Sequence, residues 1–490
     1  MNFNKLILVA AVLCLITSTS FSQIGIGTTN PDASSMLDIT STTSGMLTPR
    51  MTTTQRVAIA TPADGLLVYD TDKEAFYYWD NSVWNRLGSG EKRNNYKLVK
   101  NITDLADELT AGGGSTYLLD ENYLYEINGT ITFDYPVDLN GANIAGRDTG
   151  EDIIVNGSGT TLFSGTKGGR FRDILIDGGG QQVFDITSDG TQSVVGYSVL
   201  VTNASSLGNL SNLYAVFFNV LQVVNTNNGF NVSNITSFFV DKVFWTDGNA
   251  GTFLNLSGTF DNLQIANGRV VVNAGETGID VSSNPTITVS ASLTSVNFTG
   301  AGTIVNGYTA GTYLGYNFTN DWDVDCPGIP LEKDTSSIGD INMNFNSGTG
   351  ATTTFTGNSV PSKISGTTLS NNLFRFAKSG DNRLIYEGKK TRYFTVTASI
   401  SFQGTYTNGS NNSSGDTYVF YIAKGNNGSA TASPILETGT ARQLGASLDI
   451  GALAVVGTVQ LSPGDFIELW TENYFEDDAI FIASINAVIR

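Results

Sequence analysis

Three aspartates that lie close together in the chain could carry out sugar chemistry. Asp173, Asp177 and Asp185 fall within one stretch of short apolar segments. Two carboxyl groups that flank a glycosidic bond can supply the acid and the base or nucleophile that break it. Three basic side chains lie close by and could hold an anionic polysaccharide: Lys167, Arg170 and Arg172. These residues define one alternative for the whole chain, a β-helix polysaccharide lyase or glycoside hydrolase.

A structural role for the same aspartates is the competing interpretation. Aspartate is common in tight turns because its short side chain tolerates left-handed backbone conformations. In an extended strand Asp173, Leu175 and Asp177 would point to the same side, since side chains alternate. If Leu175 faced the core, both aspartates would too, so the sequence leaves this register open. We predict that the chain has no catalytic residues and is not an enzyme.

A second acidic cluster has the spacing of a calcium-binding loop. Asp321, Asp323 and Asp325 occupy alternate positions and Glu332 the twelfth, where an EF-hand loop places its ligands. However, Cys326 stands where such a loop needs glycine for its sharp turn, and two prolines follow it. We therefore predict a solvated linker without a metal, with calcium binding as the alternative.

Several residue types on which catalysis depends are missing. The chain contains no histidine, which excludes Ser-His-Asp and Cys-His catalysis as well as histidine-ligated metals. Its glycine triplets lack the spacing and the lysine of a phosphate-binding loop, so no cofactor is predicted. The net charge of −19 repels phosphate backbones, and the basic spot at Lys389, Lys390 and Arg392 is too small to change that. We predict no nucleic-acid partner.

The first 22 residues have the pattern of a secretory signal peptide. Lys5 precedes an apolar run from Leu6 to Ile16, and small polar residues continue to Ser22. The run is too short to cross a bilayer, which takes about 20 apolar residues. We expect export to the cell surface or the extracellular space, with no membrane span. Once the peptide is removed only Cys326 remains, so no intrachain disulfide can form.

The composition favours strands over helices. Only 14% of the residues are charged, and Gly, Asn and Thr separate short apolar runs, a pattern typical of strands joined by tight turns. The predicted organisation is a signal peptide (1–22), a small N-terminal module (23–90), a helix and cap segment (91–118), a β-solenoid (119–320), a linker (321–340) and a jelly-roll head (341–490).

The apolar runs of the N-terminal module are too short for an ordinary core, so we expect it to complete its core by association. Its strings GMLTPRMTTTQR, ATPADGLLVYDT and FYYWDNSVW resemble a module at the mature N-termini of many exported Bacteroidota proteins, and are similar to segments of tail-fibre-like proteins. The resemblance implies a surface location and a structural role. Pro49 and Arg50 could form a binding loop, or a turn in which the arginine caps carbonyls.

The middle of the chain predicts a stacked coil. Short strands recur at roughly 20–25 residues with Gly/Asn/Asp turns between them, as in repeats that share one continuous core. A short helix from Ile102 to Leu109 precedes them and is placed to cover the free edge of the first rung. The predicted fold class is therefore all-β, a right-handed parallel β-helix followed by a C-terminal jelly-roll sandwich.

The predicted head contains a strand from Thr391 to Phe402 whose apolar residues alternate. The segments RYFTVTASISF, YVFYIAKGNNG and VQLSPGDFIELWTEN resemble the trimeric C1q/TNF-type jelly roll and the C-terminal heads of some phage tail-fibre-like proteins. This resemblance implies a homotrimer and receptor binding.

Exposed aromatic residues could add a sugar-binding surface. Burial preferences instead favour the solenoid core, or a core or subunit contact in the head, for most of them: Phe238, Phe239, Phe244 and Trp245 in the solenoid, Trp470 and Tyr474 in the head.

Together these features predict a fibre-like adhesin that binds a surface polysaccharide or a cell-surface receptor through trimeric heads. A polysaccharide-degrading β-helix enzyme and a phage-derived receptor-binding tail fibre are the alternatives.

Overall fold

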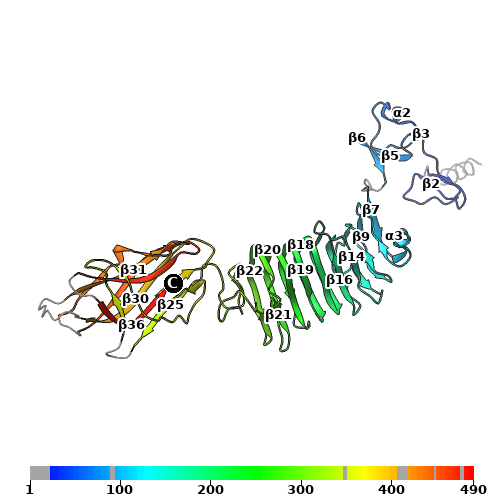
Figure 1. Cartoon of the computed structure of the whole chain (residues 1–490). Coiled ribbons are helices and arrows are strands. Elements are labelled where there is room, and N and C mark those ends of the chain that lie inside the picture. The colour runs from blue at the N-terminus through cyan, green and yellow to red at the C-terminus, as the bar shows by residue number, and fades with distance from the viewer. Residues whose placement is uncertain (1–22, 89–93, 346–349, 406–415, 446–448, 475–478) are drawn as a thin grey trace, which may run out of the picture. The chain divides into compact units, whose positions relative to one another are not determined.

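The computed structural model describes residues 23–88, 94–345, 350–405, 416–445, 449–474 and 479–490 (Figure 1). The predicted signal peptide lies outside these residues. The chain divides into two units, residues 1–94 and 95–490, and each is described by itself. In the part of the chain that the structure describes, no helix has the length and apolar character to cross a membrane.

The N-terminal unit contains two small sheets. β1 (Ile24–Ile26) and β2 (Leu37–Ile39) form a parallel pair. The second sheet has the order β3-β4-β5-β6, with bounds Arg50–Met51, Leu67–Asp70, Ala75–Asp80 and Val83–Leu87. The short helix α2 (Thr53–Val57) follows β3, and Thr52 and Gln55 close its N-terminus as a capping box.

A buried ion pair holds α2 against this second sheet. Arg56 Nε lies 2.8 Å from Asp70 Oδ2, and both side chains are almost fully buried. Burial alone would raise the pKa of Asp70, but hydrogen bonds from Arg56, Thr53 and two backbone amides lower it overall. The Arg56 guanidinium also covers the Tyr77 ring at 3.9 Å.

The second unit begins with a parallel β-solenoid whose strands belong to one sheet. Short strands form its first part: β7 (Tyr96–Val99), β8 (Tyr117–Leu118), β9 (Leu124–Ile127), β10 (Thr130–Phe133), β11 (Val137–Asp138), β12 (Asn143–Ala145), β13 (Ile153–Asn156) and β14 (Phe163–Gly165). Longer strands dominate the rest: β15 (Gly169–Asp177), β16 (Gln182–Thr187), β17 (Ser193–Ala204), β18 (Ser206–Thr226), β19 (Phe230–Trp245), β20 (Thr252–Val271), β21 (Thr277–Asp280), β22 (Thr286–Thr299), β23 (Thr303–Asn306) and β24 (Trp322–Asp325).

Stacked apolar residues form the core of the solenoid. Parallel pairing places residues of successive rungs in columns, and successive members lie from 19 residues apart (Tyr125 to Ile144) to 31 apart (Leu293 to Val324). This position of the column is occupied by a glycine, Gly196, because a Cβ there would lie only 2.4 Å from the Phe218 ring. One buried column runs through Ile144, Phe171, Gly196, Phe218, Val240, Ile265, Leu293 and Val324.

A column of left-handed residues turns each long strand at the same corner. Asp173 has φ 49°, and the residue at its place in each later rung also has positive φ. Valine and lysine rarely adopt this conformation alone, so the stacked rungs stabilise it. The column comprises Asp173, Ser198, Val220, Lys242, Asn267 and Ser295.

The first rung is covered by a short helical segment, η1 (Ile102–Leu105) followed by α3 (Ala106–Ala111). Leu105 joins the solenoid core, and Ile102 and Leu109 pack against it. Glu108 on α3 forms an ion pair with Lys97 at 2.7 Å and accepts a hydrogen bond from Tyr125 at 2.9 Å. The segment therefore covers the apolar end of the stack, as its sequence pattern predicts.

The C-terminal part of the second unit is an antiparallel sandwich. One sheet has the order β25-β36-β30-β34, with bounds Gly339–Asn344, Ala479–Ile489, Arg392–Thr405 and Ile450–Leu461; β26 (Ala351–Thr354) also pairs with β36. The other has the order β28-β29-β35-β31-β32, with bounds Phe376–Lys378, Leu384–Tyr386, Phe466–Asn473, Thr417–Gly425 and Ser433–Pro434. β27 (Ser362–Lys363) pairs with β35, β33 (Thr440–Gln443) pairs with β31, and η2 is Leu436–Thr438.

The predicted alternation of the strand Arg392–Thr405 is observed, because Phe394, Val396, Ala398, Ile400 and Phe402 are all buried between the sheets. The all-β architecture, a parallel solenoid followed by a jelly-roll sandwich, confirms the predicted fold class. The solenoid pairing extends beyond the predicted range 119–320, since β7 and β24 belong to the same sheet.

Candidate functional site

The three candidate aspartates lie on the outer surface of the solenoid in separate structural roles. Asp173 occupies the left-handed corner and pairs with Arg172 at 3.2 Å. The corner reverses the alternation of β15, so Ile174 and Ile176 are buried while Leu175 and Asp177 face outward. The register that the sequence left open is settled by this one residue with positive φ.

Asp177 and Asp185 belong to hydrogen-bonded ladders between rungs. Asp177 Oδ1 accepts from the Gly179 amide and from Asn203 Nδ2, both at 2.9 Å. Asp185 begins a ladder of asparagines at 3.1–3.2 Å that crosses the next three rungs: Asn209, Asn231 and Asn255. These contacts support turn and ladder roles, which stabilise stacked strands.

A groove of about 980 Å³ lies away from these three aspartates, beside the C-terminal sandwich. Its walls include Leu373, Lys378, Ile385 and Glu387. Glu387 is the one acidic side chain among its lining residues, and none of the three aspartates reaches it. The prediction that the chain is not an enzyme stays a prediction.

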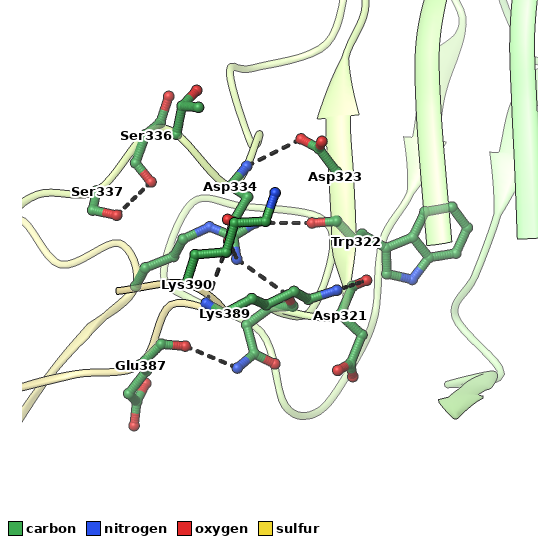
Figure 2. A network of polar contacts seen from close by, with 12 residues as sticks. Asp321, Trp322, Asp323, Asp334, Ser336, Ser337, Glu387, Lys389 and Lys390 are labelled. Atoms are coloured by element: carbon green, nitrogen blue, oxygen red, sulfur yellow. Dashed lines mark hydrogen bonds and ion pairs between the residues drawn. The ribbon is translucent and has the colours of Figure 1, made fainter. Parts of the chain in front are cut away.

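The second acidic cluster forms a strand in place of a calcium loop. Trp322 and Val324 of β24 are buried, so Asp323 and Asp325 point outward. Asp323 accepts a hydrogen bond from the Asp334 amide at 3.0 Å (Figure 2). Asp325 pairs with Lys333 at 2.9 Å. Among the described residues, no group of three or more His, Cys, Asp or Glu side chains could hold a metal ion.

Glu332, the residue at the twelfth position, is buried away from this strand's outer face. Its two carboxyl oxygens accept hydrogen bonds from the Asn317 and Phe318 amides at 3.0 and 2.9 Å. Burial raises the pKa of Glu332 despite these bonds. The Glu332 carboxyl group therefore holds the loop before β24, and both of its oxygens accept hydrogen bonds there.

The predicted linker 321–340 is instead a packed junction centred on Arg375, which the sequence did not single out. Arg375 is fully buried. Its Nη2 donates to the carbonyls of Trp322 at 2.8 Å and Glu332 at 3.0 Å, and its Nη1 donates to the Asn320 carbonyl and lies 3.3 Å from Asp334 Oδ1. The solvated linker is wrong, because a buried guanidinium with such partners fixes the segment between the strands.

The basic spot of the head completes this junction (Figure 2). Lys389 Nζ donates to the Asp321 carbonyl, and Arg392 Nη1 donates to the Asp334 carbonyl at 3.1 Å and to Ser337 at 2.8 Å. These side chains therefore bind the chain's own backbone.

The candidate aromatic residues divide between core and surface. Phe238 and Trp245 are buried in the solenoid, whereas Phe239 is half-buried and Phe244 exposed. In the head, Trp470 is half-buried and donates to Glu468 at 2.8 Å, and Tyr474 is exposed. Sequence reasoning missed several outward aromatics, among them Tyr197 and Phe217, although the spacing between rungs could have located them.

The N-terminal module exposes its apolar residues. Within residues 23–88 the buried apolar side chains are Val68 and Ala75. Far more large apolar side chains are exposed: Ile24, Ile26, Met36, Leu37, Ile39, Met46, Leu47, Val57, Phe76, Val83 and Leu87. Exposed apolar surface of this extent marks an association surface.

The β1–β2 pair is the clearest part of this surface. Ile24 pairs with Leu37, and Ile26 pairs with Ile39, so the four aliphatic side chains lie in register. Each is between 39% and 60% exposed. A two-stranded ribbon with an uncovered aliphatic face is marginal in water by itself.

A hollow of about 220 Å³ adjoins Pro49 and Arg50, lined by Met46, Leu47, Thr48, Arg50, Tyr69 and Phe76. Arg50 begins strand β3 and pairs with Tyr69, so the predicted turn does not form there. Arg50 lies over the Tyr69 ring at 5.4 Å. The arginine therefore packs on its own module.

Comparison with protein families gives one match. Residues 25–103 match the family described as a phage tail like trimerisation region. That range includes the exposed apolar module and the first strand of the solenoid. No curated protein matches the chain.

Comparison with solved structures gives weak likenesses. Murine APRIL at pH 8.0 is 9% identical, with a TM-score of 0.21 over 32% of this chain and 99% of that chain. Tailspike protein 4 of bacteriophage CBA120 is 10% identical, with a TM-score of 0.19 over 91% of this chain and 77% of that chain. Tailspike gp49 of Acinetobacter baumannii bacteriophage Fri1, described as a capsular polysaccharide depolymerase, is 9% identical, with a TM-score of 0.20 over 90% and 98%. At such scores these likenesses carry no argument about this chain.

Proposed function

We propose that this chain is an exported, fibre-like surface protein that assembles as a homotrimer through its N-terminal module. The observation that carries the proposal is that residues 23–88 bury only Val68 and Ala75 among their apolar residues and expose eleven large ones. A segment that cannot bury its apolar residues within one chain gains most by burying them against copies of itself.

The match of residues 25–103 to a trimerisation region supports three copies in the assembly. Electrostatics support an apolar contact, because chains of net charge −19 repel one another. The exposed aliphatic face of β1 and β2 carries no charged side chain, because Asp38 alternates with Leu37 and Ile39 and points to the other face.

In this proposal the solenoid is the shaft and the sandwich is the binding head. Three linked heads that each bind weakly gain avidity from their effective concentration. The ligand is a surface polysaccharide or another cell-surface component. A phage-derived receptor-binding fibre would use the same design, and the secretory pattern of residues 1–22 favours the exported form.

Native mass of the chain from Gln23 onward, measured by light scattering, tests the proposal. We expect three times the mass of one chain, and a monomer at micromolar concentration would refute it. Assays of reducing-sugar release from capsular and plant polysaccharides address the enzyme alternative on the same sample, since a sustained release would make the protein a glycosidase or lyase.

A further inference from the structure

We propose that one outer face of the solenoid binds an acidic polysaccharide through an aromatic platform, defined here as Tyr197, Phe217 and Phe239. These residues lie on the outer side of β17, β18 and β19, before the left-handed corner of each strand. The inference rests on the proposed function only in that export would bring the solenoid into contact with extracellular glycans.

The rungs place the three rings next to one another. Val195, Phe217 and Phe239 form one outward column, with one residue per rung. Neighbouring rungs are about 4.8 Å apart. Tyr197, two residues after Val195, is 47% exposed, and its ring centroid lies 5.3 Å from that of Phe217.

Such a surface suits a sugar ring. The face of an aromatic ring is electron-rich and packs against the C–H groups on the flat side of a pyranose, while its apolar area is buried in the contact. Small side chains stand in the column beside the rings, so a flat ligand can approach them: Ser193, Ala215 and Ser237. Amide side chains on the other edges, Asn219 and Gln264, can hydrogen-bond to sugar hydroxyls.

The charge at one end of the platform selects an acidic ligand. Arg170 precedes Val195 in the first column, and Arg172 precedes Tyr197 in the second. Arg170 is exposed, and the Arg172 side chain is 72% exposed while it pairs with Asp173. Asp241, which follows Asn219 in the second column, is paired with Lys242 at 3.7 Å at the other end of the platform. The two exposed guanidinium groups at this end match the carboxylates of a uronic-acid polymer.

A second copy of this chain is the competing occupant of the same face. The arginines and amides favour a polar ligand over an apolar subunit contact, because unpaired charges buried between subunits cost free energy. The test below separates the two.

Affinity electrophoresis of the full mature chain in gels that contain polygalacturonate tests the platform, with dextran as the uncharged polymer. We expect retardation by polygalacturonate that weakens with salt, and none by dextran. The double variant Phe217→Ala/Phe239→Ala should lose at least about tenfold in affinity, as ring stacking contacts of this kind do. Arg170→Gln, on an exposed side chain, should weaken binding without any effect on folding.

Phe244→Ala is the matched control. Phe244 is an exposed aromatic of the same strand as Phe239, but it lies beyond the corner at Lys242. It should bind polygalacturonate as the unmodified chain does.

Three results would overturn the inference. They are the absence of retardation of the unmodified chain by polygalacturonate, equal retardation by dextran, and a double variant that binds normally. A drop in native mass of the double variant would assign the face to a subunit contact. Because mass is read on the same samples, a monomer that still binds polygalacturonate would refute the trimer and keep the platform.

Discussion

The solenoid buries its apolar residues, whereas the N-terminal module leaves its large apolar residues exposed. In the solenoid, stacked columns such as the one through Phe171 and Phe218 are buried within a single chain. In the module, Ile26 and Leu47 face outward. A coil buries its core by adding rungs, whereas a short ribbon can only bury it against another chain. Under the proposed function, the solenoid folds by itself and the module completes its core in the assembly.

Charges placed on the β1–β2 face should have the largest effect. We expect Ile26→Asp with Leu37→Asp to reduce the native mass from trimer to monomer, because the shared aliphatic face would carry repelling carboxylates. Thr29→Asp with Asn30→Asp adds the same charge on nearby exposed polar positions and should leave the mass unchanged. Equal masses for the two double variants would remove the contrast between the regions.

Two adjacent phenylalanines test the solenoid side of the comparison. Phe218 is 1% exposed in the core, whereas Phe217 is half-buried on the outside. Phe218→Ala should lower the free energy of unfolding by about 3–5 kcal/mol, and Phe217→Ala by less than about 1 kcal/mol. Urea denaturation measures both, and equal losses would mean that the outer face is covered as well.

The contribution of Tyr308, at the C-terminal end of the solenoid, to the free energy of unfolding should fall at alkaline pH. Tyr308 donates to the Pro285 carbonyl at 2.7 Å and accepts from Trp322 Nε1 at 2.9 Å. Tyr308→Phe should cost about 1–2 kcal/mol at neutral pH. Burial raises the pKa of Tyr308 from 10.0 to about 12, so the phenol stabilises the fold fully below pH 10.0. The difference between the two proteins should therefore shrink as the pH rises from 10 to 12, as urea denaturation at each pH would show.

The smallest effect concerns Cys326, whose thiol lies against the end of the solenoid core. Burial raises its pKa from 9.0 to about 11. At pH 8 the folded chain should hold about 100-fold less thiolate than the unfolded one. We expect a thiol reagent to label Cys326 only as fast as the solenoid opens, and immediate labelling in native buffer would show that this end is not closed.

The sequence predicted the elements and some of their roles well. Alternating apolar residues predicted a head strand from Thr391 to Phe402, which is observed as Arg392–Thr405. The helical spacing of Ile102, Leu105 and Leu109 predicted the cap. It predicted a solvated linker for residues 321–340, because two prolines and a cluster of charges interrupt the strand pattern there, whereas the structure buries Trp322, Val324 and Glu332. The buried Arg375 contacts carbonyls up to 55 residues away, and such distant partners leave no local pattern.

The role of each candidate residue depended on register. Asp173, Phe217 and Phe239 belong to ordinary strand patterns in the sequence, and the nearest left-handed corner in each strand decides which side the side chain faces. That corner is stabilised by the rungs above and below it, so no local propensity specifies it.

The sequence by itself determined that this chain is acidic, lacks histidine, and alternates short apolar segments with turn residues, because these are properties of composition and of neighbours along the chain. Only the tertiary structure decided which apolar residues are enclosed and which remain outside. Enclosure depends on contacts between residues 19 or more positions apart, and those contacts exist only once the rungs have stacked.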